Sequence, residues 1–464
     1  MHNYEYEKGI FLFHRDLRIQ DNTGLIQTIK KCKSIYLVFI FTPEQVGSAN
    51  PYKSNNSVQF MIESLQDLNE QTHKKLNVLY GNTNKVMKEC IKKWNIDYVC
   101  FNKDYTPYAI ERDDSLCQLC EKMDIKCEMT SDYYMYEPGS ILNVTGTPYQ
   151  KFTPFYNTVK SIKPTLPKLI RLTLTKSPFV SSNIPNYSIS LQYAMSKFTK
   201  LNIHILSHGG REVGLKVLDH ALKTQKQYSK TRDILSIPTS LLSPYIKFGC
   251  VSIREVFHKF RTIKDLIRQL IWREFYINIL YTHPHVLGHA MKPNYNKIRW
   301  RTNARYLNAW KSGTTGYPIV DAGMRQLNTT GYMHNRARLI VASFLTKTLL
   351  IDWREGEQYF AQKLVDYDPA SNNGNWQWIA STGADSQPYF RIFNPFHQSE
   401  EVDEDAIYIK TWVPELKDIP AKEIHNWDKY HTEYKSKIHY PAPIVDYSLQ
   451  KEKAIEMYSS IFKG

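Results

Sequence analysis

The sequence lacks a run of roughly 18 to 20 apolar residues, the length that a membrane-spanning helix needs, so we expect a soluble, globular protein. Its first ten residues, MHNYEYEKGI, lack the basic and apolar regions of a secretory signal. Its seven cysteines, an odd number in 464 residues, describe no disulfide framework. We therefore expect a protein that is not secreted and that works in a reducing compartment, the cytoplasm or the nucleus.

A CxxC motif at Cys117 and Cys120, with Cys127 nearby, is the one spacing that suggests a metal site. No fourth Cys or His lies close enough to complete a site locally, and the segment is typical of a helix that runs into a strand. We expect a structural role for these cysteines and no metal.

Nucleotide-binding signatures are also missing. From residue 9 to about 130, short apolar runs alternate with amphipathic stretches, which predicts an α/β domain with a doubly wound parallel sheet. The predicted strands are Gly9–Phe13, Ile35–Phe41, Asn77–Tyr80 and Asp97–Phe101, and the predicted helices are Asn22–Cys32, Ser57–Thr72, Thr83–Trp94 and Tyr108–Met123. Neither GxGxxG nor GxxxxGK[ST] follows the first strand, so we expect a ligand other than NAD or ATP.

The rest of the chain changes character twice. Residues 133–207 are rich in Pro, Ser, Thr and Lys without a sustained period, which predicts a connector. Residues 208–464 predict a larger all-α domain, because apolar residues recur there at helical spacing. The predicted helices are Glu212–Leu222, Ile253–Phe260, Lys264–Tyr281, Asp321–Asn328, His334–Thr346 and Trp353–Leu364. The first domain then covers residues 1–132.

The net charge of +15 is the first indication of a partner. Excess Lys and Arg attracts polyanions, which favours nucleic acid before an anionic membrane. A solubilising surface or a lysine-rich composition explains the charge equally well.

Tryptophan is concentrated in the helical half, where eight of nine lie after residue 270. Trp310, Trp412 and Trp427 are consistent with ordinary core positions. Trp376 and Trp378 lie two apart on a predicted helix and so point about 200° away from each other. One can face a cofactor inside the protein while the other faces a base outside.

Two further segments contain polar residues that could bind a ligand. Asn335, Arg338 and Leu339 share one helix face, and a buried Arg338 needs a carboxylate partner, Asp366 or Asp368. A structural ion pair is the alternative. Hydroxyl and basic groups suited to phosphate gather at Tyr228, Arg232, Thr239, Ser240, Ser243 and Lys247. Simple helix capping is the alternative there.

These segments together resemble the photolyase and cryptochrome family over nearly the whole chain. The segments that carry the resemblance, in family order and spacing, are FHRDLRIQDNTGL, TSLLSPYIKFG, LIWREFY, GYPIVDAGMRQL, HNRARLIVASFL, IDWREGEQYF, NNGNWQW and YFRIFNP. The resemblance is strongest to class I photolyases of cyclobutane pyrimidine dimers, through HNR, NNG and WQW. It implies an antenna-chromophore domain in residues 1–132 and a FAD- and DNA-binding catalytic domain in residues 208–464.

The resemblance implies a U-shaped FAD in the helical domain. Arg338 pairs with Asp366 over the isoalloxazine, Asp368 bonds the ring, and Asn372 lies beside flavin N5, where a neutral amide stabilises reduced flavin. The implied FAD-binding residues are Tyr228, Arg232, Thr239, Ser240, Leu241, Leu242, Ser243, Lys247, Arg338, Asp366, Tyr367, Asp368 and Asn372.

The resemblance also implies light-driven repair of damaged DNA. Trp300, Trp353 and Trp376 match a chain that carries an electron to the flavin, and excited reduced flavin donates an electron to a flipped-out dimer. Trp272 and Trp378 match the aromatic walls around that dimer. The implied DNA-binding residues are Gln269, Trp272, Arg273, Asn335, Arg336, Leu339 and Trp378, and the implied catalytic residues are Trp300, Trp353, Trp376, Asn372 and Gln269.

Two positions depart from the dimer-repair pattern. Gln269 replaces the family's glutamate and Leu339 its methionine. An amide cannot supply a proton, so we expect repair to be less efficient than in a glutamate enzyme. Leu339 is nearly isosteric with Met and has a milder effect.

Other readings of the resemblance differ in their residues. Six-four photolyases share the glutamine but carry two histidines where this chain has Asn335 and Leu339. Cryptochromes, which are light sensors, often carry a long tail and another residue in place of Asn372. A flavin-loaded DNA-binding protein without turnover is the third reading, and Gln269 favours it. We expect a monomer that binds damaged DNA and no membrane.

A second, light-harvesting chromophore is also implied. The residues that hold folate in relatives are not evident in Thr42–Asn50 or Tyr105–Ala109. Asp104 with the following TPY favours a deazaflavin or flavin, although a turn residue at a strand end is an equal explanation for Asp104. An empty antenna pocket remains an alternative.

Overall fold

The computed structural model describes residues 4–162 and 177–462. They form two compact units, each described by itself below. The sheet unit comprises Met1–Asn202, Ser207–Thr224 and Ser240–Pro284, and the helical unit comprises Ile203–Leu206, Gln225–Thr239 and His285–Gly464. The domain division predicted at residues 132 and 207 stays a prediction.

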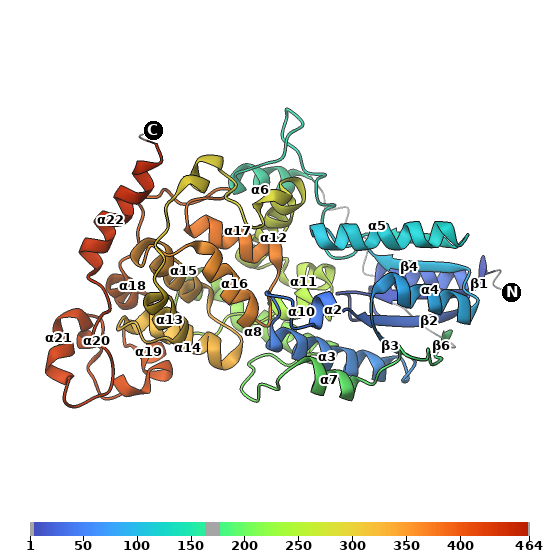
Figure 1. Ribbon diagram of the computed structural model, residues 1–464, viewed down its shortest axis with the longest axis horizontal. Helices are drawn as coiled ribbons and strands as arrows, with labels where there is room; N and C mark the ends of the chain where they lie inside the picture. Colours follow the sequence, from blue (N-terminus) through green and yellow to red (C-terminus); the bar gives the residue numbers. More distant parts are fainter. Residues whose placement is uncertain (1–3, 163–176, 463–464) are drawn as a thin grey trace. The chain divides into compact units, whose positions relative to one another are not determined.

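In the described part of the chain, six parallel strands form the sheet of the sheet unit (Figure 1). Their order is β3-β2-β1-β4-β5, with β6 beside β2, so the chain reverses direction across the sheet after β3. This order confirms the predicted doubly wound fold. The strands are β1 (Tyr6–Phe13), β2 (Cys32–Phe41), β3 (Asn77–Tyr80), β4 (Tyr98–Asn102), β5 (Lys126–Thr130) and β6 (Phe179–Val180).

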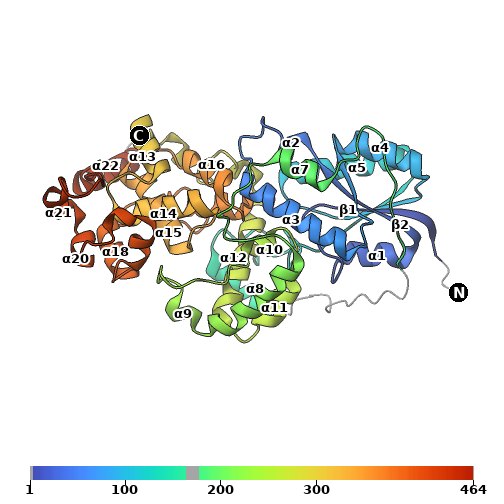
Figure 2. The ribbon, with the colours of Figure 1, turned by 90° about the horizontal axis from the view of Figure 1, so that it is seen from below.

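Helices cover both faces of this sheet. Helices α1 (Thr23–Lys31) and α3 (Asn55–Gln71) lie on one face, and α4 (Thr83–Trp94) and α5 (Pro107–Lys122) lie on the other (Figure 2). The apolar stripe of α4 packs on β1 and β4 in a shared hydrophobic core. Asn22 and Asn82 cap the first turns of α1 and α4 with their side-chain oxygens.

The predicted connector holds more structure than its composition indicated. Helix α6 (Phe152–Ser161) buries Phe152, Phe155 and Val159, and Phe155 contacts Phe275 edge to face. Tertiary packing of these apolar side chains outweighs the weak local pattern. The other helices of the sheet unit are α2 (Pro43–Val46), α7 (Leu191–Phe198), α8 (Arg211–Thr224), α10 (Ser243–Lys247), α11 (Ile253–Phe260) and α12 (Lys264–Thr282).

A buried ionic network lies at the carboxyl end of the sheet. Arg18 and Arg254 each donate to Asp132, at 2.6 and 2.7 Å, and Arg254 also donates to Asp21 at 2.8 Å. All four side chains are at most 4% exposed. Burial alone would raise the pKa of Asp132, but the two guanidinium groups outweigh it and lower that pKa to about 2. The network joins the loop after β1, the end of β5 and α11.

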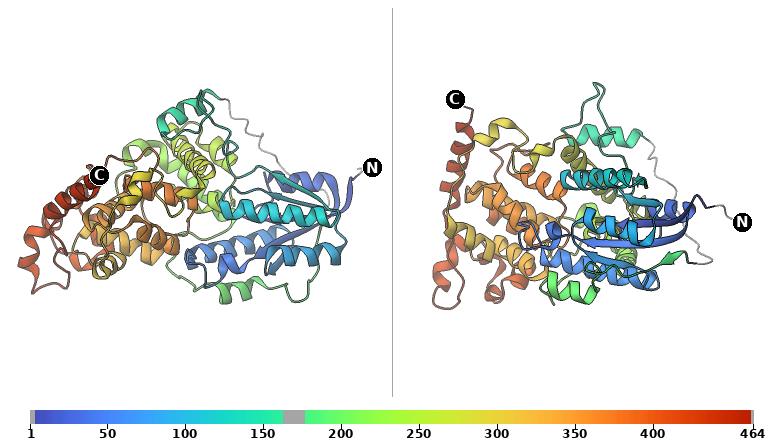
Figure 3. Two further views of the ribbon diagram at one scale, coloured as in Figure 1. Left: turned by 45° about the horizontal axis from the view of Figure 1, so that its top comes forward. Right: turned by 45° about the vertical axis from the view of Figure 1, so that its right-hand side comes forward.

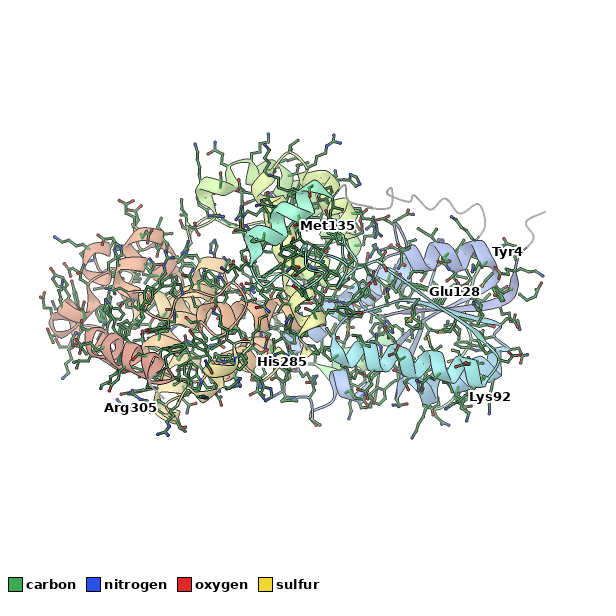
Figure 4. All side chains as sticks on the ribbon, turned by 90° about the horizontal axis from the view of Figure 1, so that it is seen from above. Tyr4, Lys92, Glu128, Met135, His285 and Arg305 are labelled. Atoms are coloured by element: carbon green, nitrogen blue, oxygen red, sulfur yellow. The ribbon has the colours of Figure 1, made fainter. Side chains whose placement is uncertain are left out.

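Glu274 fixes α12 in a similar way. Its fully buried carboxylate accepts hydrogen bonds from the backbone N–H groups of Met135 (Figure 4) and Tyr136, at 2.9 and 3.2 Å. Burial raises the pKa of Glu274 to about 7, although Arg273 and the two N–H groups oppose that rise. The chain segment after β5 is thereby tied to α12.

The helical unit packs around one hydrophobic core. Its helices are α9 (Tyr228–Thr231), α13 (Ala304–Ser312), α14 (Pro318–Thr330), α15 (Asn335–Ser343), α16 (Trp353–Lys363), α17 (Pro369–Ile379), α18 (Pro395–Val402), α19 (Ile407–Trp412), α20 (Ala421–Ile424), α21 (Trp427–Tyr434) and α22 (Tyr447–Ser460). Helix α22 runs along the edge of this unit (Figure 3). Short 3-10 helices span Gln225–Gln227, Pro284–Val286, Pro293–Lys297 and Pro414–Leu416.

One predicted helix is divided in two. The sequence predicted a continuous helix over His334–Thr346, but α15 ends at Ser343 and a π-helix follows over Phe344–Thr348. The apolar pattern continues through both segments, so it does not reveal the change of pitch. Within residues 4–162 and 177–462, no helix is both long and apolar enough to cross a membrane.

Replacing Asp132 with Asn is expected to lower the free energy of unfolding by about 3 to 5 kcal/mol, because two buried guanidinium groups lose the carboxylate that neutralises them. Urea unfolding at pH 7 measures the change. Glu7→Gln is the matched control, since it removes an exposed pair with Lys33 (58% and 73% exposed), and it should leave the midpoint unchanged. Equal losses in both variants contradict the assigned role of the network.

Glu274→Gln is expected to flatten the pH dependence of unfolding. Because the folded pKa of Glu274, about 7, lies above its usual 4.5, its contribution is full below pH 4.5 and is lost as the pH rises through 7. The variant should therefore lose less stability between pH 5.5 and 8, by up to about 2 kcal/mol. Urea unfolding at the two pH values tests this, with Asp265→Asn in the first turn of α12 as control. An unchanged slope for Glu274→Gln is the contrary result.

Candidate functional site

The predicted site residues are divided between the two units. The sheet unit carries Ser240, Leu241, Leu242, Ser243, Lys247, Gln269, Trp272 and Arg273. The helical unit carries Tyr228, Arg232, Thr239, Trp300, Asn335, Arg336, Arg338, Leu339, Trp353, Asp366, Tyr367, Asp368, Asn372, Trp376 and Trp378.

The ion pair predicted for Arg338 is present in the helical unit. Its Nη2 donates to both oxygens of Asp366, at 3.0 and 3.3 Å, and its Nε donates to the carbonyl oxygen of Met333 at 2.8 Å. Asp366 is 5% exposed, while Arg338 is 25% exposed. The pair therefore presents part of a fixed cation to a ligand.

Asp368 has a different role in the fold. Its Oδ1 accepts the N–H of Ser371 at 3.0 Å and caps α17, which has Pro369 at its first position. Of the two carboxylates that the sequence left open as partners of Arg338, Asp366 makes the ion pair. Tyr367 lies half-buried between them.

Asn372 is held in one orientation on α17. Its Nδ2 donates to the carbonyl oxygen of Glu357 at 3.0 Å, and the residue is 8% exposed. Across the described residues, no donor is paired with its Oδ1. The side chain thus presents a neutral acceptor, which suits an N–H group of a ligand.

The neighbouring amides of α17 hold the helix in place. Gln377 donates to the carbonyl oxygens of Val286 and His289 at 2.9 and 3.0 Å, and Asn373 donates to Val286 at 3.1 Å. Gln377 Oε1 also accepts the N–H of Met291. These bonds fix the rotation of α17 and so the directions of Asn372 and Trp376.

The three tryptophans of the predicted electron path differ in burial. Trp376 and Trp353 are 2% and 1% exposed and belong to the same core, and the half-buried Trp300 packs against it. Trp378 is half-buried, as expected for a residue on another face of α17. A Cβ atom on Gly356 would lie 2.1 Å from the Trp376 ring, so only glycine allows this packing.

The polar groups predicted for phosphate are partly engaged already. Thr239 Oγ1 lies 2.9 Å from the hydroxyl oxygen of Tyr332, and the exposed Arg232 lies 3.5 Å from Asp233. Tyr228 is half-buried at the start of α9. Asp233 also accepts from Arg336 at 2.6 Å, whereas Asn335 is exposed and Leu339 half-buried.

In the sheet unit, the Ser240–Ser243 segment leads into α10. Leu241 has a φ of +53°, an unfavourable value for a branched side chain, which shows that the loop is held by its surroundings. Ser243 is exposed, Ser240 half-buried and Leu242 buried. The Lys247 ammonium lies 3.4 Å from Ser57 Oγ and over the Phe248 ring, so it is engaged with α3.

Helix α12 carries the other predicted DNA residues. Trp272 stacks on Phe152, with ring centroids 3.6 Å apart and planes 5° apart, so Phe152 covers one face of the indole. Arg273 donates to the carbonyl oxygen of Tyr133 at 2.9 Å and lies over the Tyr134 ring. Arg273 is thus turned inward, whereas Gln269 is half-buried on the same helix.

Several partners were not predicted from the sequence. Asp233, Phe152, Glu274 and Tyr332 each contact a predicted site residue. Phe152 and Tyr332 lie far along the chain from their partners, whereas Asp233 and Glu274 directly follow Arg232 and Arg273. Only Glu274 gave a local signal, because it is an acidic residue within an apolar helix pattern.

Asp104, the predicted antenna residue, accepts from Arg15 at 2.6 Å, and Arg15 lies over the rings of Tyr133 and Tyr134. A small cavity of about 20 Å³ lies at the ends of β1 and β2. Its lining includes His14, Thr42 and Gln45, each with a buried polar atom that has no partner. This volume fits one buried water and is too small for a chromophore ring.

The helical unit fits a flavin. Asn372 offers a neutral acceptor to a ring N–H, and Arg338 offers a cation that is 25% exposed. In the described residues, no cluster of His, Cys, Asp and Glu could hold a metal ion.

Comparison with known proteins agrees with this fit. Residues 9–171 match the DNA photolyase family, and residues 266–460 match the FAD binding domain of DNA photolyase. The chain is 36% identical to the deoxyribodipyrimidine photo-lyase of Halobacterium salinarum, over 97% of this chain and 98% of the relative. It is 35% identical to that of Alkalihalophilus pseudofirmus, over 100% and 99%.

Solved structures give the same picture. The archaeal photolyase from Sulfolobus tokodaii, crystallised with two FAD molecules, superposes with a TM-score of 0.86 at 40% identity, over 98% of this chain and 100% of that one. The class III photolyase from Agrobacterium tumefaciens superposes with a TM-score of 0.90 at 31% identity, over 100% and 99%. The chain therefore belongs to the DNA photolyase family and carries that family's FAD-binding domain.

Proposed function

We propose that this protein is a deoxyribodipyrimidine photo-lyase that uses light and FAD to split cyclobutane pyrimidine dimers in DNA. The observation that carries the proposal is the Asn372 amide, which is fixed by Glu357 and presents a neutral oxygen. Two relatives more than 30% identical over almost their whole length have this activity in their names.

The roles proposed for the flavin-binding residues follow their chemistry. Bound, reduced FAD supplies the light absorption and the single electron that split the dimer. Arg338, neutralised by Asp366, would lie against the ring, and Asn372 would accept a ring N–H without adding negative charge beside it. Asp368 and Tyr367 would border the ring. The residues proposed for the phosphates are Tyr228, Arg232, Thr239, Ser240, Leu241, Leu242, Ser243 and Lys247.

Trp300, Trp353 and Trp376 are proposed to conduct an electron inward. Trp300 is half-buried and offers the outer end of the path, while the other two indoles lie in the dry core of the helical unit. Gly356 keeps Trp376 in contact with its neighbours.

To bind DNA, some of the proposed residues have to exchange a contact within the protein for a contact with the DNA. Arg336 is paired with the half-exposed Asp233, so a phosphate has to compete with that carboxylate. Asn335 and Trp378 are proposed to contact the lesion, with Trp272 as the second aromatic wall. Arg273 supports α12 from inside, and its proposed part in DNA binding is indirect.

A flavin or deazaflavin is proposed as second chromophore of the sheet unit. The half-buried Arg15–Asp104 pair beside two tyrosine rings suits a planar, polar ring. The Sulfolobus tokodaii structure is described as implying a novel light-harvesting cofactor.

The proposed partner is DNA that contains pyrimidine dimers, bound by a monomer in a reducing compartment. The net charge of +15 and the seven free cysteines agree with that setting.

Photoreduced protein is expected to restore thymines in an oligonucleotide that carries one cyclobutane thymine dimer, in blue light and not in darkness. Chromatography of the oligonucleotide measures repair. Trp300→Phe is the control: it should keep repair when the flavin is reduced chemically but lose reduction by light. Dimer binding without repair in light, with flavin present and reduced, rejects the proposal and favours a light sensor.

Gln269→Glu is expected to raise the repair yield per absorbed photon several-fold, up to about tenfold, the equivalent of one charge-assisted hydrogen bond of about 1.4 kcal/mol. A carboxyl group can donate or share a proton with the cleaving dimer, which an amide cannot do. Leu339→Met is the control and should change the yield little. If the yield of Gln269→Glu equals that of the unmodified protein, Gln269 does not limit repair.

A further inference from the structure

Three cysteines gather in the sheet unit where α5 packs on the edge strand β5. Cys117 of α5 and Cys127 of β5 have their Sγ atoms 2.7 Å apart. Cys120, one turn further along α5, also lies close enough to interact with Cys127. Glu128, the neighbour of Cys127, is marked in Figure 4. None of the three is among the residues assigned to flavin or DNA.

The pair is accessible from one side. Strand β5 is the last in the strand order, so no further strand covers its outer edge in the described residues. Cys117 and Cys127 are half-buried, whereas Cys120 is fully buried. Met129, two residues beyond Cys127 and on the same side of the strand, is 41% exposed. A small solute can therefore reach Cys117 and Cys127 more easily than Cys120.

The two thiols are not equivalent. The hydrogen bond from Cys127 lowers the pKa of Cys117, which favours its thiolate. Hydrogen bonds with Cys117 and Cys120, together with burial, raise the pKa of Cys127, so Cys127 keeps its proton. The thiolate is the nucleophilic form of cysteine, which makes Cys117 the reactive member.

A metal does not account for the arrangement. In the part of the chain that the structure describes, no group of His, Cys, Asp and Glu side chains has an arrangement that could hold an ion. The half-buried pair instead has the features of a reactive thiol beside a resolving thiol.

We propose that Cys117 and Cys127 form a dithiol that reacts with hydroperoxides and closes to a disulfide between α5 and β5. The Cys117 thiolate attacks one oxygen of hydrogen peroxide, so an S–O bond forms, the O–O bond breaks and hydroxide leaves, taking up a proton as water. The Cys127 thiol then gives up its proton as its sulfur attacks the sulfur of the Cys117 sulfenic acid, the S–O bond breaks, and the hydroxyl group leaves with that proton as a second water. The two sulfurs lose two electrons in total and the peroxide gains them. Thiol reductants reverse the reaction.

The test treats the flavin-loaded full-length protein with hydrogen peroxide in darkness, so that the flavin generates no oxidant. After free thiols are blocked with a maleimide, peptide mass spectrometry locates disulfides. We expect the loss of two of the seven thiols and a peptide that joins Cys117 to Cys127, both reversed by dithiothreitol. In Cys127→Ser, dimedone should trap a sulfenic acid at Cys117. In the matched control Cys120→Ser, the link should form as before.

Three results overturn the proposal. The first is oxidation of the exposed Met129 to its sulfoxide without any Cys117–Cys127 link. The second is a link that uses Cys120 instead. The third is stoichiometric zinc binding that protects all three thiols. Peptide mass spectrometry of the peroxide-treated protein without substitutions distinguishes these results even if a variant fails to fold.

Discussion

The sheet unit depends on the burial of two arginines against two aspartates. Removing Arg18, Arg254, Asp132 and Asp21 from water is costly, and only the complete set of short contacts compensates for it. The loop after β1, the end of β5 and the start of α11 therefore have to meet in one arrangement. Helix α12 follows α11 directly and is fixed again by Glu274. Gln269 and Trp272 lie on α12, so the ionic network and Glu274 together determine where these two side chains are placed.

In the helical unit, a single helix determines most of the proposed chemistry. Asp368 caps α17 and sets where it begins, and the amides of Asn373 and Gln377 set its rotation through Val286. With those two quantities fixed, helical geometry places Asn372 and Trp376, four residues apart, on the same side. Trp378 is then directed to another face, where it is half-buried. A cofactor contact, an electron path and a base contact can thus arise from seven consecutive residues.

The sequence predicted the helices that a local apolar pattern defines, and it missed structure that depends on contacts between distant segments. Thr83–Trp94 and Ile253–Phe260 were predicted with the bounds the structure has, because an amphipathic period and a capping residue define each one. Helix α6 was missed because Phe152 and Phe155 are stabilised by aromatic residues of α12. The choice between Asp366 and Asp368 stayed open for a related reason. Both suit Arg338 in spacing, and only the capping bond of Asp368 separates their roles.

The residues proposed to bind flavin are held by fixed contacts, whereas the arginine proposed to bind DNA is held by a contact that can exchange. Arg338 and Asn372 are anchored to backbone carbonyl oxygens, which do not move with a side chain, so their free atoms are organised before the flavin arrives. Arg336 is instead held by Asp233, a half-exposed carboxylate. Such a pair costs little to open, and salt weakens both it and the phosphate contact that would replace it. A cofactor that stays bound requires the first kind of contact, and a DNA strand that must be released after repair requires the second.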